Sequence, residues 1–513
     1  MKLGRILKYL SAVRFWLVRQ IHISWQITGV AAGLLAGVGL SLVPETAVFA
    51  HWSWLILAVA CAVLAFARCK TWLIIFAIIA GLLVGMWRGT IERVELNDYG
   101  QFLGQNITLS GKVFEDPSVG LSGELKLRLV DVVVDGVDLP GQVWASVVGT
   151  RGAEVRRSDI VTIAGKLKSG FGTFPASMSY ASLKSVETIA GSDPARDLRD
   201  AFGEELETAI DDPAKDLGMG ILAGQKTALP IDISEAFRIA GLTHIVVASG
   251  YNLTILIRFA RRLFAKVSRL AALIGGAASA FGFACVTGFS PSMSRAALVT
   301  GLSLLAWYYG RKFHPIVLLL IVAAITAIIN PAYVWGDAGW YMSFMAFAGV
   351  IILAPLIRAY FWPNKITASS ELARSRTWRE RLGSVRQIFI ETMSAQLMTA
   401  PIIALFMGNF SPYGLLANLL VLPIVPLTML LTFIAGIVGW LIPPIAEIVG
   451  WPAQVMLDYI ITVARFVSEL PGASQEVTFG LPLFVAVILL IVATIVYLRY
   501  RTGHHLRNDN VVE

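Results

Sequence analysis

The stretch Gly241-Leu-Thr-His-Ile-Val-Val-Ala-Ser-Gly-Tyr-Asn252 decides how the whole chain is interpreted. It places a His, a Ser, a Gly and an Asn in a segment that is otherwise apolar enough to enter a lipid bilayer. Polar groups in hydrocarbon are unfavourable unless they are paired, so they mark packing or transport roles. Glycine adopts backbone conformations that other residues avoid, and we therefore expect the helix to break at Ala248-Ser249-Gly250.

Three interpretations of this stretch stay open. In the first, a broken helix lines a polar path, because irregular backbone at membrane depth is tolerated where it borders a cavity. In the second, the polar side chains form hydrogen bonds between helices and fix their packing. The third, a serine hydrolase, needs a base and an oxyanion hole beside Ser249, and the sequence has no Gly-x-Ser-x-Gly elbow. Under the first, the channel-lining candidates are His244, Ser249, Gly250 and Asn252.

The composition is that of a membrane protein. Of the 513 residues, 56% are hydrophobic and 15% are charged, whereas soluble domains average about 45–50% and about 25%. The net charge of +8 is explained by the Lys/Arg excess that cytoplasmic loops carry, and it is not by itself evidence of nucleic-acid binding. The three cysteines provide neither a disulfide framework nor metal-ligand spacing. We expect no cofactor and no metal.

Residues 1–94 predict a basic amphipathic helix on the inner membrane face, over 1–26, followed by three membrane spans. A signal peptide cleaved after Ala50 is the alternative, but the long basic segment and the two further spans favour a retained helix. The spans are expected at about 27–43, 52–67 and 72–87. Glycines recur at intervals of four, a spacing that favours close helix packing over a pore lining; they are Gly29, Gly33, Gly37, Gly81 and Gly85.

Residues 95–190 predict a small β-barrel, with an OB-fold as the natural candidate. Short alternating apolar runs are separated by turn dipeptides such as Asp135-Gly136 and Pro140-Gly141. The strands are expected at 106–114, 124–134, 142–148, 159–168 and 181–189. The distribution of Lys and Arg between the first loops places this domain outside the cytoplasmic membrane.

The predicted barrel has a basic and aromatic segment that is compatible with single-stranded nucleic acid. Residues 100–190 hold nine Lys/Arg and nine Asp/Glu, so their net charge is zero, but five basic residues precede two phenylalanines. The alternative is an ordinary solvated hairpin face. The DNA-binding candidates are Arg151, Arg156, Arg157, Lys166, Lys168, Phe171 and Phe174.

Residues 191–238 predict an amphipathic connector with a short surface or re-entrant segment, and residues 239–498 predict a second membrane block. Its basic clusters all fall on one side if the chain crosses nine times, which gives about twelve transmembrane helices in total. Residues 445–470 are expected to lie at the outer interface, because four charged side chains interrupt them. The tail 499–513 would then be cytoplasmic, as would the N-terminus. The nine spans are expected at about 243–258, 270–289, 293–309, 315–330, 339–358, 387–407, 412–426, 427–442 and 479–498.

Five stretches in order resemble the ComEC family of competence DNA-uptake membrane channels. They are the opening stretch, Gly220-Ile-Leu-Ala-Gly-Gln225, Ser290-Pro-Ser-Met-Ser-Arg-Ala296, Asn330-Pro331 with Gly339-Trp-Tyr-Met-Ser343-Phe344, and Leu415-Leu-Ala-Asn418-Leu-Leu-Val-Leu-Pro423. The resemblance covers about residues 90–460 and adds Ser343 and Asn418 to the channel-lining candidates. Arg295 joins them because an anionic backbone that crosses a membrane needs cations along its route.

The resemblance implies a multi-pass cytoplasmic (inner) membrane channel that carries single-stranded DNA inward, in contact with membrane lipids. It also implies a separate DNA receptor and a cytoplasmic motor or helicase, since no Walker A motif occurs here. Many relatives carry a second His where Asn252 stands, which puts a metal or proton role there in doubt. Many also carry a metallo-β-lactamase-like domain that this chain lacks, so we expect no enzyme activity and a nuclease supplied by another chain.

The alternative function is a transporter or envelope-assembly protein for a smaller solute, with the barrel as an interaction module. The zero net charge of the barrel segment favours it. Oligonucleotide binding with a steep salt dependence would discriminate between the two functions, because phosphate contacts release counterions.

Overall fold

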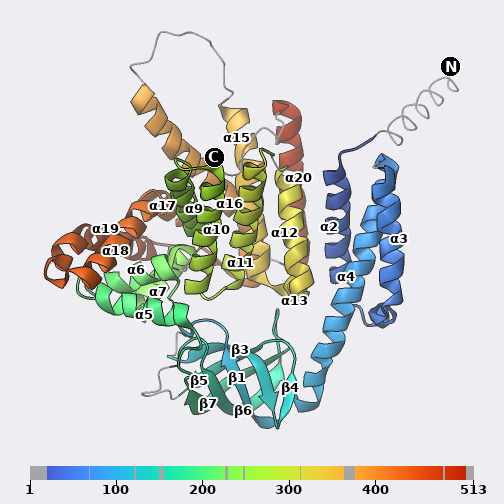
Figure 1. Cartoon of the computed structure of the whole chain (residues 1–513), viewed down its shortest axis with the longest axis horizontal. Helices are drawn as coiled ribbons and strands as arrows, with labels where there is room; N and C mark the ends of the chain where they lie inside the picture. Colours follow the sequence, from blue (N-terminus) through green and yellow to red (C-terminus); the bar gives the residue numbers. More distant parts are fainter. Residues whose placement is uncertain are drawn as a thin grey trace.

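The computed structural model describes residues 20–68, 70–120, 123–148, 155–225, 229–246, 249–311, 314–362, 376–477 and 480–503. It is mostly helical, with one β-barrel at one end of a set of upright helices (Figure 1). Candidate Arg151 lies outside the described residues. So do residues 1–19 of the basic helix predicted over 1–26 and most of the basic loop 362–386.

The barrel closes through five long strands. These are β1 (Asn106–Val113), β3 (Leu125–Val134), β5 (Val143–Val148), β6 (Ile160–Ser169) and β7 (Ala176–Glu187), and the short β2 (Ser118–Val119) and β4 (Val137–Leu139) pair with β3. The ring runs β1-β3-β5-β7-β6 and returns to β1; the β5–β7 pair is parallel and the others are antiparallel. Inward side chains such as Leu129, Val143 and Ile163 are fully buried, as the period of two requires.

Strand β7 begins five residues before the predicted position. Its regular alternation is interrupted at Tyr180, whose φ of 56° is unusual for a residue with a side chain. The Tyr180 backbone amide donates to Ser146 Oγ (2.9 Å), and the pairing register shifts beside it. The sequence pattern therefore missed the first half of β7, because the bulge reverses which side chains face the barrel interior.

The first three described helices form a hairpin-like unit beside the main bundle, seen at the right of Figure 1. They are α2 (Ile23–Leu40), α3 (Ser53–Arg68) and α4 (Ile74–Leu96). The backbones of α2 and α4 approach so closely that a Cβ on Gly33 would overlap the Ile78 carbonyl oxygen, and one on Gly81 the Val30 carbonyl oxygen. The glycines spaced at four are thus packing residues, as predicted. Helix α4 continues down to the barrel.

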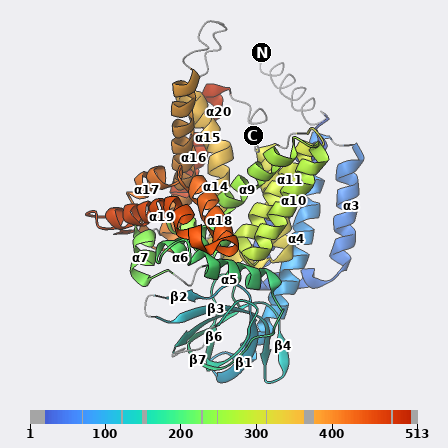
Figure 2. The ribbon, with the colours of Figure 1, turned by 60° about the vertical axis from the view of Figure 1, so that its left-hand side comes forward.

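The second membrane block consists of an upright bundle and a lateral layer. The bundle holds α9 (Gly250–Phe264), α10 (Arg269–Val286), α11 (Pro291–Tyr308), α12 (Pro315–Ile329), α14 (Ala338–Ala348), α15 (Ala354–Phe361), α16 (Arg376–Phe406) and α20 (Leu481–Thr502). The lateral layer lies to one side and above the barrel (Figures 1 and 2). It holds α5 (Pro194–Leu206), α6 (Ala214–Ala223), α7 (Ile231–Ile239), α17 (Gly414–Val421), α18 (Val425–Leu441) and α19 (Ala446–Ser468).

One hydrophobic core joins all the helices of the lateral layer. It contains fully buried Leu206, Leu217, Ile233, Val421 and Leu457, one each from α5, α6, α7, α17 and α19. The connector and residues 414–468 therefore form one packed unit, although about 175 residues separate α7 from α17 in the sequence.

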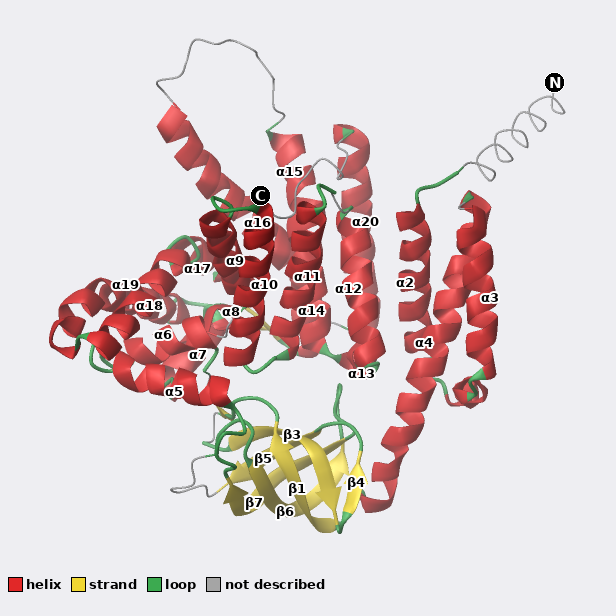
Figure 3. Ribbon diagram, in the orientation of Figure 1, coloured by secondary structure: helices red, strands yellow, loops and turns green. Residues whose placement is uncertain are grey.

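Six described helices are long and apolar enough to cross a membrane, or up to eight if each bent pair forms one span. The predicted total of about twelve stays a prediction, and it counts residues 412–426 and 427–442 as two separate crossings. The helix α17 has eight residues and α18 leaves it at an angle of 50°; at 1.5 Å per residue α17 covers about 12 Å of a hydrocarbon core of about 30 Å. In Figure 3, α17 lies with α18 and α19 in the lateral layer.

Candidate functional site

The helix that carries the opening stretch is broken where the sequence predicts. The short α8 (Thr243–Val246) ends before residues 247–248, which the structure does not describe, and α9 begins at Gly250. Ser249 has extended backbone angles (φ −112°, ψ 164°) at the start of α9. A Cβ on Gly250 would lie 3.0 Å from the Cβ of Ala296 on α11, so this position also allows a close approach between two helices.

The polar side chains of this stretch have different surroundings. Asn252 is 1% exposed; its Nδ2 donates to the Ile221 carbonyl of α6 (2.9 Å), and its Oδ1 accepts from Ser249 Oγ (3.3 Å). His244, by contrast, is exposed, and Ser249 is half-buried. Asn252 thus ties α9 to the lateral layer, which is the packing role, whereas for His244 the lining of a polar path stays a prediction.

Replacing Asn252 with Leu is expected to lower the thermal unfolding temperature of the detergent-purified protein, because the Ile221 carbonyl loses its donor. Interhelical hydrogen bonds in membranes contribute about 1 kcal/mol. The matched control is Thr254→Val, which removes a hydroxyl that donates only to Gly250 O of its own helix (2.8 Å). Equal unfolding temperatures for the two variants would contradict the tie.

The remaining membrane candidates lie on three other helices, α17, α14 and α11. Asn418 of α17 is 2% exposed and its Oδ1 has no hydrogen-bond partner among the described residues. Ser343 of α14 is half-buried. Arg295 lies in the first turns of α11, near the barrel, and is 5% exposed. The candidates therefore divide between the interior of the block and its barrel-facing end.

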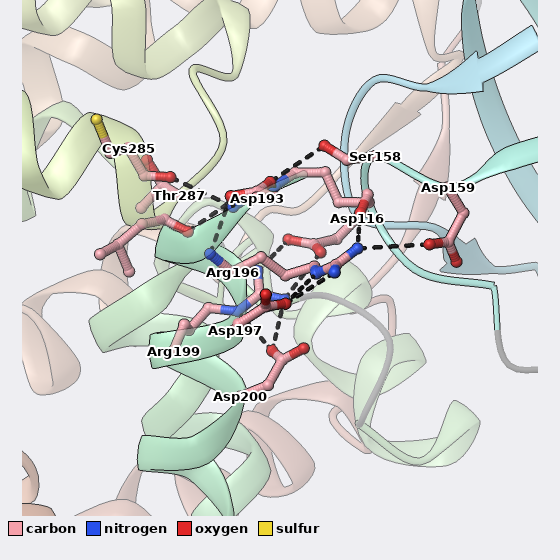
Figure 4. A network of polar contacts seen from close by, with 12 residues as sticks. Asp116, Ser158, Asp159, Asp193, Arg196, Asp197, Arg199, Asp200, Cys285 and Thr287 are labelled. Carbon is pink, nitrogen blue, oxygen red and sulfur yellow. Dashed lines mark hydrogen bonds and ion pairs between the residues drawn. The ribbon is translucent and has the colours of Figure 1, made fainter. Parts of the chain in front are cut away.

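A network of arginines and aspartates joins the barrel to α5 and the membrane block (Figure 4). Arg157 Nε and Nη2 donate to both carboxylate oxygens of Asp193 (2.7 and 3.1 Å). The same guanidinium donates to the carbonyls of Val286 (3.0 Å) and Cys285 (3.3 Å) at the end of α10. One buried side chain thus links the barrel, the start of α5 and α10.

Two arginines of α5 point back at the barrel and complete the network. Arg199 forms an ion pair with Asp116 through both oxygens, and Arg196 donates to Asp159 (3.4 Å) and to the Arg157 carbonyl. The side chains of Arg157, Arg196 and Arg199 are each 3% exposed. Bidentate Arg–carboxylate pairs fix orientation as well as distance, so the barrel is held in one pose on the membrane block.

This network changes the role of one predicted DNA contact. Arg157 is buried and makes four hydrogen bonds, so it does not face the barrel surface as expected. Arg156 is exposed with its amide bonded to Asp159 (2.7 Å), and Lys166 and Lys168 are exposed on β6. DNA contact stays a prediction for these three basic residues and for the two phenylalanines.

Two residues missing from the sequence-based candidates join the predicted phenylalanines. The ring of Trp144 lies edge-on to Phe171 (5.5 Å between centroids), and Phe171 lies edge-on to Phe174 (5.5 Å). The Arg128 guanidinium lies 5.0 Å from the centroid of Phe174. Arg128 and Trp144 are directly paired across β3 and β5, and that register is the signal that would have found them.

A family model for the competence protein matches residues 221–502, more than half of the chain. The chain belongs to the competence protein family. Its match begins in α6 and ends with α20, so it includes the α8–α9 break, the upright bundle and most of the lateral layer. Membership of the competence family indicates a membrane protein with a role in DNA uptake. No curated protein and no solved structure matched the chain.

The network makes the stability of this competence-family protein pH-dependent in acid. Burial by itself would raise the pKa of Asp193, but hydrogen bonds from Arg157 and the Arg196 amide, with the Arg157 charge, hold the pKa below its usual range. This contribution is present above the ordinary pKa of an Asp, about 3.9, and is lost as pH falls through the lower folded value. Asp193→Asn should therefore flatten the acid limb of an unfolding-temperature profile.

The pKa of Asp216, in α6, is shifted in the opposite direction to that of Asp193. Burial, and then the negative charge of Asp212, raise its pKa to about 6. Ionised Asp216 therefore opposes folding at neutral pH, and this opposition decreases as pH falls from about 6 toward the ordinary pKa of an Asp, about 3.9. Asp216→Asn should raise the unfolding temperature more at pH 7.5 than at pH 5; an equal change at both values would contradict the shift.

Proposed function

We propose that this protein is the channel through which single-stranded DNA enters the cytoplasm during DNA uptake. The observation that carries the proposal is the geometry of a competence-family membrane block with a β-barrel fixed on one end of it. A barrel that receives the strand must stay aligned with the route across the membrane. The buried network of Arg157, Arg196 and Arg199 supports such alignment.

We propose that the barrel is OB-like and that about twelve helices cross the inner membrane, with both termini cytoplasmic. The strand order and the single parallel pair, β5 with β7, support the first statement. The barrel then lies outside, since it is at the end of the bundle opposite Arg499 and Arg501 of α20. We assign the degradation of the other strand, and the motor that pulls the strand inward, to separate proteins. We propose that this chain itself is not an enzyme.

The test is transformation frequency in a strain that lacks this gene, with the gene restored on a plasmid as the control. Loss of transformants in the deletion strain, with normal DNA binding at the cell surface and full restoration by the plasmid, is the expected result. Unchanged transformation would overturn the proposal and would favour a transporter for a smaller solute, which the zero net charge of residues 100–190 suggests.

A further inference from the structure

The barrel contacts the membrane block at a second place, away from the arginine network. A Cβ on Gly172, in the turn between β6 and β7, would lie 3.3 Å from the Gly336 carbonyl oxygen. Gly336 ends α13 (Ala332–Gly336) and precedes Asp337, which caps α14 by accepting from the Trp340 amide (2.6 Å). The turn that touches the membrane block is thus the one that carries Phe171 and Phe174.

Arg295 approaches the same place from the membrane side. Its Nη2 donates to the carbonyl of Gly339, in the first turn of α14 (3.1 Å), while Nε and Nη1 have no partner among the described residues. A guanidinium that is 5% exposed and rests on one neutral carbonyl is unfavourable, since buried charges ordinarily have a partner. Unsatisfied buried donors of this kind call for a ligand or a functional reason.

Charged groups of the barrel and the membrane block meet at Tyr333 of α13. Burial raises the pKa of its phenol, and four charged side chains act on it: Arg128, Arg295, Asp337 and Glu115. Arg128 is 3.5 Å from Glu115, and Asp337 is occupied as a helix cap. Of the two arginines at this junction between the barrel and the membrane block, Arg295 is therefore the one that no carboxylate of the described residues contacts directly.

We infer that the seam between the barrel and the membrane block is a nucleotide-binding station for single-stranded nucleic acid, with bases stacking on Phe171 and Trp144 and a phosphodiester bound by Arg295. The inference rests on the proposed function and names the point where the strand passes from the barrel to the membrane block. Phe171 is 54% exposed, so part of its side chain is accessible to a base. Aromatic stacking beside a cation is how single strands are held without sequence preference.

Arg128 supports the station as a positioning residue. Its guanidinium lies over Phe174 (5.0 Å) and its cross-strand neighbour is Trp144, so it holds the aromatic cluster together through a cation–π contact. Phosphate bound at Arg295 satisfies the two free donors and supplies the missing negative charge. Among the described residues that act on Tyr333, the charges of two arginines and two carboxylates cancel, and Arg295 is the cation with donors left for a phosphate.

The test is binding of a short fluorescein-labelled oligothymidylate to the full-length protein in detergent, followed by anisotropy. Phe171→Ala should weaken binding about fivefold or more. Arg295→Met should weaken it and lower the slope of log affinity against log salt by about 0.7, the value for one phosphate contact on a single strand. Tyr180→Asn is the matched control, because Tyr180 is an exposed aromatic of the same barrel and Asn tolerates its positive φ.

A second readout separates a binding role of Arg295 from a structural one. Removing an unpaired buried charge should leave the unfolding temperature of Arg295→Met equal to or above that of the wild type, and Arg295→Lys should restore part of the affinity. An abasic oligonucleotide should lose the effect of Phe171→Ala and keep that of Arg295→Met. A lower unfolding temperature with unchanged oligonucleotide affinity would overturn the inference.

Lipid headgroups also carry phosphate, so a further measurement distinguishes binding of lipid from binding of the oligonucleotide. In nanodiscs of phosphatidylcholine and of phosphatidylglycerol, oligonucleotide binding by the wild type should exceed that of Arg295→Met in both. If Arg295→Met instead alters only the affinity for phosphatidylglycerol, the station binds lipid and the inference is wrong. If the wild type and Arg295→Met bind the oligonucleotide equally well, and both restore transformation in the deletion strain, the station is rejected and the proposed function stands.

Discussion

Replacing Arg157 with Ala is expected to loosen the attachment of the barrel to the membrane block. The substitution removes four hydrogen bonds and leaves the Asp193 carboxylate, 15% exposed, without its guanidinium. Breaking a buried ion pair by deleting one partner destabilises a protein by about 3–5 kcal/mol. We expect a lower unfolding temperature and rapid proteolysis of the segment between β7 and α5, while the helical bundle stays intact.

The matched control is Arg238→Ala. Arg238 of α7 is also bidentate, to Glu235 (2.6 and 2.8 Å), but its side chain is 43% exposed, and such surface pairs contribute less than about 1 kcal/mol. Arg157→Ala and Arg238→Ala should therefore differ clearly in protease resistance. If they behave alike, the network does not hold the barrel in place.

Replacing Gly33 with Leu is expected to separate α2 from α4. Any side chain at this position meets the Ile78 carbonyl, which is backbone and cannot turn away. Overpacking of this kind destabilises by about 3 kcal/mol, and by more where backbone must move. The yield of folded protein in the membrane should fall sharply.

Gly39→Leu is the control on the same helix, because a Cβ at Gly39 meets nothing within 4 Å. It removes the same glycine flexibility and adds the same side chain without the collision. Normal yield for Gly39→Leu and low yield for Gly33→Leu are expected, measured by detergent extraction and size-exclusion chromatography. Equal yields would mean that the α2–α4 contact is not needed for assembly.

The sequence predicted those features that local pattern determines. Alternation located the barrel strands to within a few residues except at β7, where the bulge at Tyr180 reverses the pattern. Ser249-Gly250 located the helix break, since a polar residue and a glycine in an apolar run are a local signal. The glycines at intervals of four indicated the α2–α4 contact.

Features that depend on distant partners could not be predicted in the same way. Arg157 stands in a basic run, and nothing local indicates that Asp193, thirty-six residues later, faces it. Trp144 and Arg128 belong to separate strands and become one site only when the barrel closes and pairs them. The number of crossings depends on distant partners too, because hydrophobicity alone does not separate a crossing helix from one buried in the lateral layer.

The central claim, that this chain conducts one DNA strand into the cytoplasm, is tested most directly by following strand-labelled DNA into cells. Duplex DNA labelled on either strand is supplied to the wild type, to the deletion strain and to the complemented strain, and nuclease-protected cytoplasmic label is measured. We expect single-stranded label inside the wild type and the complemented strain, and surface-bound label alone in the deletion strain. Protected cytoplasmic label in the deletion strain at the wild-type level would contradict it.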